Sequence, residues 1–163
     1  MSYIDIEYYV SLYGDIEEGR FNRLSFHASR KIDQHTTGVD GVKKLRVAFP
    51  KAEYDAEAVK RCAANLVSYL SQIDDAETAA SISRGYDKTD LGLQRKIVSR
   101  VEAGNEAISY SESTGPDTII DKAVSSRADR EILISNVIKE YLSGVTDANG
   151  VNLLYMGPYP HLM

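Results

Sequence analysis

The sequence predicts a mainly α-helical domain. A small bundle of about four helices surrounds a long central helix and carries one β-hairpin and an extended C-terminal arm. In three stretches, apolar residues recur three and four positions apart, which is the period of a helix with one buried face. A fourth stretch alternates about a Gly-Asn pair, as a β-hairpin does. The chain closes on an apolar stretch with two prolines, which exclude a helix there.

The central helix is expected from Asp55 to Ile73. Asp55 is a good N-cap residue, and Tyr54 and Val59 occupy the two positions of a hydrophobic staple. At about 1.5 Å per residue this helix spans nearly the width of a small domain, and the polar run DDAETAAS allows it to continue. The buried face is expected to consist of Val59, Cys62, Ala63, Leu66, Tyr69, Leu70 and Ile73.

Three further segments predict helices. Residues 3–12 predict a short helix or an extended arm, rich in tyrosine. A helix from about 16 to 34 follows, with Asp15 as its N-cap and Glu18 at the capping-box position. Ser126 is expected to cap the last helix, and Gly144 is expected to end it.

The connections are rich in glycine, proline and polar residues. Residues 36–54 predict a connection with one helical turn around Val42–Leu45. Its basic residues, Lys43, Lys44 and Arg46, are interpreted as part of a solvated loop; a contact with an acidic partner or with DNA is the alternative. Residues 85–92 predict a link between elements, and residues 113–125 predict a loop.

Residues 96–112 give the strongest strand signal in the chain. Gly104-Asn105 fits a two-residue type II′ turn, and pairing around it places Val101 opposite Ile108. A single hairpin is only marginally stable in water, so this one is expected to pack on the helices or to pair with another chain. The candidate contacts with a neighbouring subunit are Arg100, Glu102, Gly104, Asn105 and Glu106.

The tail leaves two alternatives open. After the turn signal Asn149-Gly150, the residues from Val151 to Met156 are apolar and compatible with a strand. This stretch either folds back as an edge strand on its own domain or docks on a neighbouring chain by strand addition. The chain is accordingly divided into a single domain over residues 1–150 and a C-terminal arm over residues 151–163.

Composition limits the classes of function. The chain has 163 residues, enough for one core, and a net charge of −5, which argues against a broad basic surface for phosphates. Its one cysteine, Cys62, is interpreted as a core residue and fits a reducing compartment. Without a cationic leader or an apolar run of membrane-spanning length, the protein is expected to be soluble and cytoplasmic where it is made.

The sequence carries no familiar catalytic motif. Phosphate loops, dinucleotide-binding loops, nucleophile elbows and zinc-ligand spacings do not occur in it. The carboxylate pairs Glu17-Glu18 and Asp74-Asp75 are adjacent on helices, where neighbours point about 100° apart and make poor acid–base pairs. We therefore expect a protein that is not an enzyme and that uses neither a metal nor a cofactor.

Four blocks, taken in order, resemble the head-tail connector (adaptor) proteins of long-tailed bacteriophages and of prophages in Gram-positive bacteria. The first is the tyrosine-rich start followed by FNRLSFHASRKIDQHTTG, and the second is the helix AVKRCAANLVSYLSQI. The third is the hairpin IVSRVEAGNEAISYSES, and the fourth is the closing pattern VIKEYLSGVTDANGVNLLYMG. Each block alone is weak, whereas their order and spacing are fairly specific. The segment 76–95 and the tail PYPHLM do not match that pattern.

The resemblance implies a structural virion protein that joins the portal vertex of the phage head to the tail. Such a protein forms a ring around the DNA channel, typically of twelve subunits, and is located at the head-tail interface after assembly in the host cytoplasm. Its partners are the portal protein, the next head-completion or tail component and its own copies. DNA passes through without sequence-specific binding, and an acidic chain suits such a channel because like charges repel. The residues proposed to bind portal or a neighbouring subunit are Val151, Asn152, Leu153, Leu154, Tyr155, Met156, Gly157 and Tyr159.

The alternative from another class is a small helical DNA-binding or regulatory protein. Its only support is a set of basic residues on the second predicted helix, which could face a DNA groove. These residues are Arg20, Arg23, Arg30 and Lys31.

Overall fold

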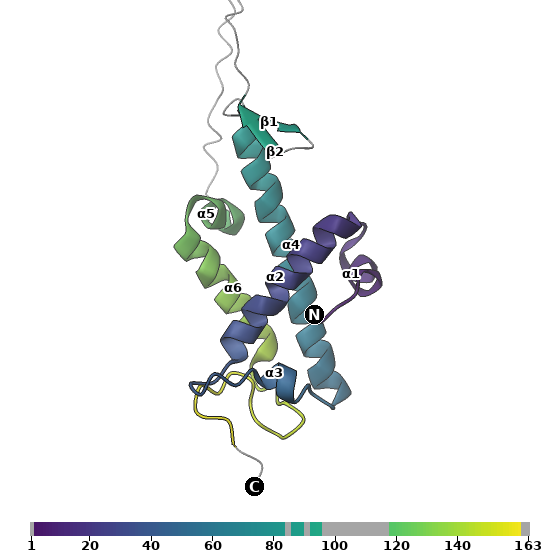
Figure 1. The fold of residues 1–163 in the computed structure, drawn as a ribbon, viewed down its shortest axis with the longest axis vertical. Helices are drawn as coiled ribbons and strands as arrows, with labels where there is room; N and C mark the ends of the chain where they lie inside the picture. The colour runs from purple at the N-terminus through teal and green to yellow at the C-terminus, as the bar shows by residue number, and fades with distance from the viewer. Residues whose placement is uncertain (1, 84–85, 90–91, 96–117, 161–163) are drawn as a thin grey trace, which may run out of the picture.

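The fold is that of a computed structural model, which describes residues 2–83, 86–89, 92–95 and 118–160. The described part of the chain is mainly helical, as predicted (Figure 1). Its elements are α1 (Ile6–Tyr13), α2 (Glu18–Thr36), α3 (Lys44–Val47), α4 (Glu53–Ser83), β1 (Tyr86–Thr89), β2 (Gly92–Arg95), α5 (Ile119–Ser125) and α6 (Arg127–Leu142).

Helix α4 is the longest helix of the described residues, and α2, α5 and α6 pack on it. In Figure 1, α2 crosses α4 near its middle, while α5 and α6 lie beside it. Helix α4 has 31 residues, so it runs on through the polar stretch after Ile73 and is about 46 Å long. The predicted central helix is therefore confirmed, with a longer C-terminal half.

The start of α4 differs from the prediction because a tertiary contact engages its first turn. The helix begins at Glu53, two positions before Asp55, so Asp55 is not its N-cap. The Asp55 carboxylate instead accepts hydrogen bonds from the backbone N–H and the hydroxyl of Thr146, at 3.1 and 3.0 Å. Tyr54 is 83% exposed, so the predicted hydrophobic staple does not form.

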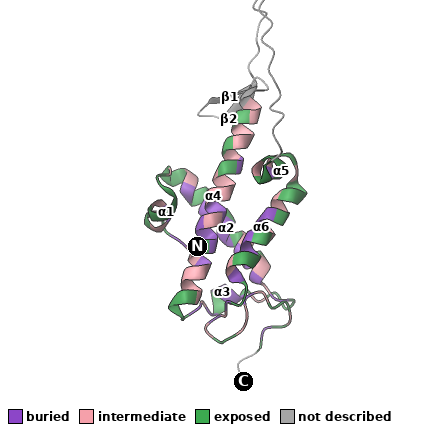
Figure 2. Ribbon diagram, turned by 180° about the vertical axis from the view of Figure 1, so that it is seen from behind, coloured by how far each residue is buried: buried purple, intermediate pink, exposed green. Residues whose placement is uncertain are grey.

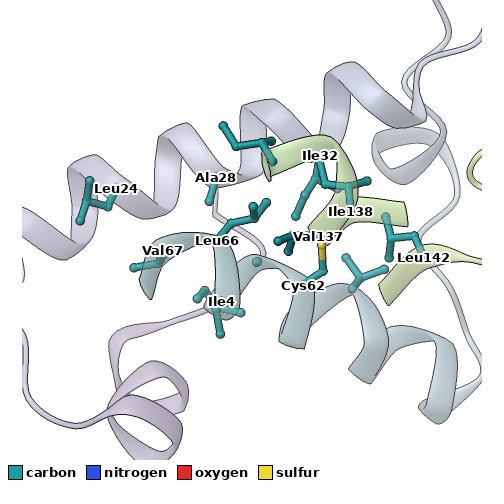
Figure 3. Packing of buried hydrophobic residues seen from close by; sticks show 14 of the residues in the cluster. Ile4, Leu24, Ala28, Ile32, Cys62, Leu66, Val67, Val137, Ile138 and Leu142 are labelled. Atoms are coloured by element: carbon teal, nitrogen blue, oxygen red, sulfur yellow. The ribbon is translucent and has the colours of Figure 1, made fainter. Parts of the chain in front are cut away.

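The core lies where α2, α4 and α6 meet (Figure 3). Five of the seven predicted α4 residues are buried, and Tyr69 and Leu70 pack against the cluster with part of their surface exposed. Ala64 and Val67 are buried as well, on a side of α4 that the predicted stripe left out. Helix α4 therefore buries a wider arc than a surface helix does. Figure 2 shows purple, buried residues on α4 near its crossing with α2.

The remaining helix boundaries follow their capping groups. The carboxylate of Glu17, not Asp15, caps α2 by accepting hydrogen bonds from the N–H groups of Gly19 and Arg20. Helix α5 occupies residues 119–125, where a loop was predicted over 113–125, because Thr118 and Asp121 form a capping box at its start; residues 113–117 lie outside the described residues. Ser126 caps α6 as predicted, and Gly144 follows its end with a φ of +81°.

The two strands lie near the C-terminal end of α4; β1 falls within the link predicted at 85–92, whereas β2 begins at the last residue of that link. They pair antiparallel, with Tyr86 opposite Arg95 and Thr89 opposite Gly92. The hairpin predicted near 96–112 lies outside the described residues. Its proposed subunit contacts, Arg100, Glu102, Gly104, Asn105 and Glu106, lie outside them too.

Candidate functional site

Residues 145–160, called the C-terminal segment below, fold back onto the body of the protein. Asp147 N–H donates to the carbonyl of Val151 at 2.9 Å, and Thr146 and Asn152 form an isolated β-bridge. Gly150, with a φ of +77°, makes the tight reversal that Asn149-Gly150 predicted. An extended arm is thus not supported over residues 151–160. Of the two alternatives, the structure has this stretch folded back on its own domain.

A buried lysine holds this segment in place. Lys44 has no exposed surface, and its Nζ donates to the carbonyls of Asn152 and Leu153, each at 3.1 Å, and to that of Tyr155. Because a buried ammonium must be compensated by hydrogen bonds, these carbonyls stand in for water. Burial lowers the pKa of Lys44, an effect that the negative charges of Asp147 and Asp40 oppose. The earlier interpretation of Lys44 as a solvated loop residue is wrong.

Tyr159 anchors the far end of the segment. Its hydroxyl donates to the buried carboxylate of Asp147 at 2.6 Å, and its backbone N–H donates to Asp40 at 2.6 Å. Asp147 also accepts hydrogen bonds from the N–H groups of Asn149 and Val151. Burial and the hydrogen bond to Asp147 raise the pKa of Tyr159, so the phenol remains a donor at neutral pH. Tyr159 is therefore a structural anchor within the chain.

The N-terminal residues are fastened to α3 by a second cation. Arg46 donates to the Asp33 carboxylate through Nε and Nη2, at 3.0 and 2.8 Å. Tyr3 donates its hydroxyl to the same carboxylate, and its ring lies 4.9 Å from the Arg46 guanidinium carbon. Burial and the hydrogen bond to Asp33 raise the pKa of Tyr3. The four-residue helix α3 thus joins both ends of the chain, the C-terminal one through Lys44.

The proposed docking residues divide into buried and exposed groups. Leu153 is fully buried and Tyr159 is 6% exposed, whereas Tyr155 is 50% and Met156 is 55% exposed. Val39 is 76% exposed, and its N–H donates to the carbonyl of Met156 at 3.1 Å. We call Val39, Tyr155 and Met156 the C-terminal patch. The residues with intermediate burial are Val151, Asn152, Leu154 and Gly157.

Three of the four basic residues proposed to read DNA are engaged in ion pairs. Arg20 contacts Asp75 at 2.6 Å, and Arg23 contacts Asp74 at 2.8 Å. On the other half of α2, Lys31 contacts Glu131 at 2.5 Å. These carboxylates neutralise the cations and orient them along α4 and α6, which weakens the case for a DNA-reading helix. Arg30 instead lies over the ring of Phe26.

Sequence reasoning missed the roles of Lys44 and Asp147, the two buried charges that hold the C-terminal segment. Asp147 had a usable signal, because an Asp two residues before a turn residue favours an Asx turn, and its carboxylate accepts from the N–H of Asn149 at 2.8 Å. Lys44 had none, since its partners are backbone carbonyls more than a hundred residues away.

The one cysteine of the chain, Cys62, is part of the core. Burial raises the pKa of the Cys62 thiol to about 12, which is the behaviour of an inert core cysteine. Among the described residues, no three His, Cys, Asp or Glu side chains are grouped so that they could hold a metal ion. No helix in that part of the chain has the length and apolar character needed to cross a membrane. Comparisons of the chain with protein families, curated proteins and solved structures found no match.

Proposed function

We propose that the protein is a structural component of a bacteriophage virion, which joins the portal vertex of the head to the tail in a ring around the DNA channel. The order and spacing of the four sequence blocks support this function. The observation that carries it is the C-terminal patch, an exposed apolar surface formed by Tyr155 and Met156, which are expected to meet the portal protein, and by neighbouring Val39. The next head-completion or tail component is the expected partner on the other side of the ring.

The C-terminal patch has the chemistry of a protein interface. Tyrosine and methionine are enriched in such interfaces, because they bury a large apolar area. The patch is also preorganised, since Lys44 holds the carbonyl of Tyr155 and Val39 holds that of Met156. A preorganised surface loses little conformational freedom on binding. Although one patch is small, a ring presents many copies at once and gains strength through multivalency.

The charge of the chain favours a channel protein over a DNA reader. Its net charge is −5, and the cations of Arg20, Arg23 and Lys31 are already paired with carboxylates. DNA moving past such a surface is repelled within a Debye length of about 10 Å rather than retained. This arrangement suits a ring through which DNA passes without sequence-specific binding.

The proposal is tested by mixing the purified protein with its cognate portal protein and imaging the product by electron microscopy. We expect a ring seated on the portal.

The double variant Tyr155→Ala/Met156→Ala should bind portal at least about tenfold more weakly, because it removes the centre of the interface. Tyr54→Ala is the matched control, since Tyr54 is exposed at the start of α4. Failure of the unaltered protein to bind portal would reject the function. Unchanged binding by the double variant would reject the patch.

A further inference from the structure

A second apolar surface lies between α4, α5 and α6. It is a groove of about 350 Å³, formed by Tyr69 of α4, Ile119 of α5 and one face of α6. Ile119 and Ile132 are 65% and 56% exposed, although both are large apolar side chains. Two exposed isoleucines beside a groove mark a surface that gains free energy when a partner covers it.

The rim of this groove is mostly acidic. Asp129 and Glu140 lie at its edge on α6, and Lys122 lies at its edge on α5. Within the described part of the chain, neither carboxylate has a basic side chain within ion-pair distance. The groove therefore suits an occupant that combines a large apolar group with a positive charge.

Helix α2 presents such a group. Phe26 is 49% exposed on the side of α2 that faces away from the core, and the guanidinium carbon of Arg30 lies 5.9 Å from the centre of its ring. Arg30 is exposed, and no carboxylate among the described residues forms an ion pair with it. Phe26 and Arg30 are one helical turn apart, so they form a single aromatic and cationic projection.

We infer that the groove between α4, α5 and α6 binds the Phe26–Arg30 projection of a second copy of this chain. The phenyl ring packs against Ile119 and Ile132, and the guanidinium of Arg30 meets the carboxylate of Glu140. Two different surfaces of one subunit then meet head to tail, which is a heterologous contact. Closure of this contact into a ring rests on the proposed function, whereas the pairwise contact does not.

Charge reversal tests the pairing. Sedimentation velocity should detect self-association of the unaltered protein at concentrations up to about 1 mM. Arg30→Glu and Glu140→Arg should each weaken it about tenfold, and the chain carrying both changes should recover it. Arg61→Glu is the matched control, since Arg61 is an exposed arginine on another face, and its self-association should be unchanged. A strictly monomeric protein, or two reversals that fail to compensate, would overturn the inference.

Cross-linking tests the geometry. The native Cys62 is fully buried, so cysteines introduced at exposed positions react selectively with a short bismaleimide. Asn22 is exposed one turn before Phe26, and Asp129 lines the groove beside Ile132, so cysteines at these two positions leave the proposed contact intact. Mixing the Asn22→Cys and Asp129→Cys proteins should yield a cross-linked dimer, whereas mixing Val47→Cys, an exposed position on α3, with Asp129→Cys should yield little. If Ile132→Cys is protected from labelling equally at every dilution, the chain covers its own groove and the inference is wrong. Neither test uses portal, so the self-contact and the proposed function can fail independently.

Discussion

Lys44 is the residue that fastens the C-terminal segment to α3. Its ammonium is fully buried and bonded to carbonyls of the C-terminal segment, 108 residues away in the case of Asn152. A charge in such a position is tolerated only while its hydrogen bonds are made. Removal of the ammonium leaves three carbonyls without this donor, and that of Leu153 is buried, so its loss of a partner costs more than the bond itself is worth.

We therefore expect Lys44→Met to lower the free energy of unfolding by about 3 kcal/mol, because it keeps most of the volume and removes the donor. Urea denaturation followed by circular dichroism measures this change. Lys43→Met is the matched control, since Lys43 is an exposed neighbour with the same charge, and it should change stability by less than about 0.5 kcal/mol. Equal effects of the two substitutions would show that the buried hydrogen bonds contribute nothing specific.

Individual residues were predictable where local pattern decides their position. Cys62 was placed in the core from the apolar spacing alone, and it is fully buried. Lys44 was placed in solvent, because lysine is rarely buried and its neighbours Lys43 and Arg46 are exposed. Lys44 is buried because the carbonyls of a remote segment bond its ammonium, and no local sequence pattern indicates such partners.

The junction between α2 and α6 contains a histidine whose charge state is linked to folding. Burial lowers the pKa of His35, and the charges of Lys31 and Lys139 lower it further, while Glu131 raises it. The unfolded chain therefore binds a proton at His35 at a higher pH than the folded chain does. The stability that His35 contributes is fully present above its unfolded pKa of about 6.5 and is lost as the pH falls through its folded pKa.

Between pH 7 and pH 5, the unaltered protein should consequently lose more stability than the His35→Gln variant. Urea midpoints at the two pH values measure this difference, and the subtraction removes the titration of all other groups. His27→Gln serves as the control, because His27 is an exposed histidine on the same helix. The linkage would be disproved if His27→Gln and His35→Gln gave the same pH dependence as the unaltered protein.

Whole elements were predictable in proportion to their length. Helices α2, α4 and α6 each repeat an apolar spacing over several turns, and each is present. Helix α5 has only seven residues, so its capping pair Thr118 and Asp121 was the sole local signal, and a loop was predicted. The starts of α2 and α4 lie about two residues from their predicted positions. Glu17 caps α2 in place of Asp15, and Asp55 bonds to Thr146 instead of capping α4.

For the whole molecule, the sequence could predict the helical class but not the path of the C-terminal segment. That path depends on buried contacts with α3 and with the loop before it, made by Lys44 and Asp40. Polar contacts between remote segments leave no repeating pattern in the sequence, whereas an amphipathic helix repeats its apolar residues every three or four positions. The proposal that this segment docks on a partner stays a prediction, and two of its residues, Leu153 and Tyr159, are buried in their own domain.

Removal of residues 151–163 should therefore destabilise the domain rather than detach an independent arm. The deletion takes away Leu153, which is fully buried, and Tyr159, whose hydroxyl is bonded to buried Asp147, and it leaves the Lys44 ammonium without its carbonyls. Loss of the leucine alone costs about 3 kcal/mol by the usual measure of large-to-small changes in a core. We expect the truncated chain to melt at a clearly lower temperature, as followed by circular dichroism.

The full-length variant Tyr155→Ala/Met156→Ala is the control, because it alters the same segment only where it is exposed, and its melting temperature should stay close to that of the unaltered protein. A truncated chain that melts as the full-length protein does would mean that the segment packs on the domain without stabilising it, and would restore the arm as the better description.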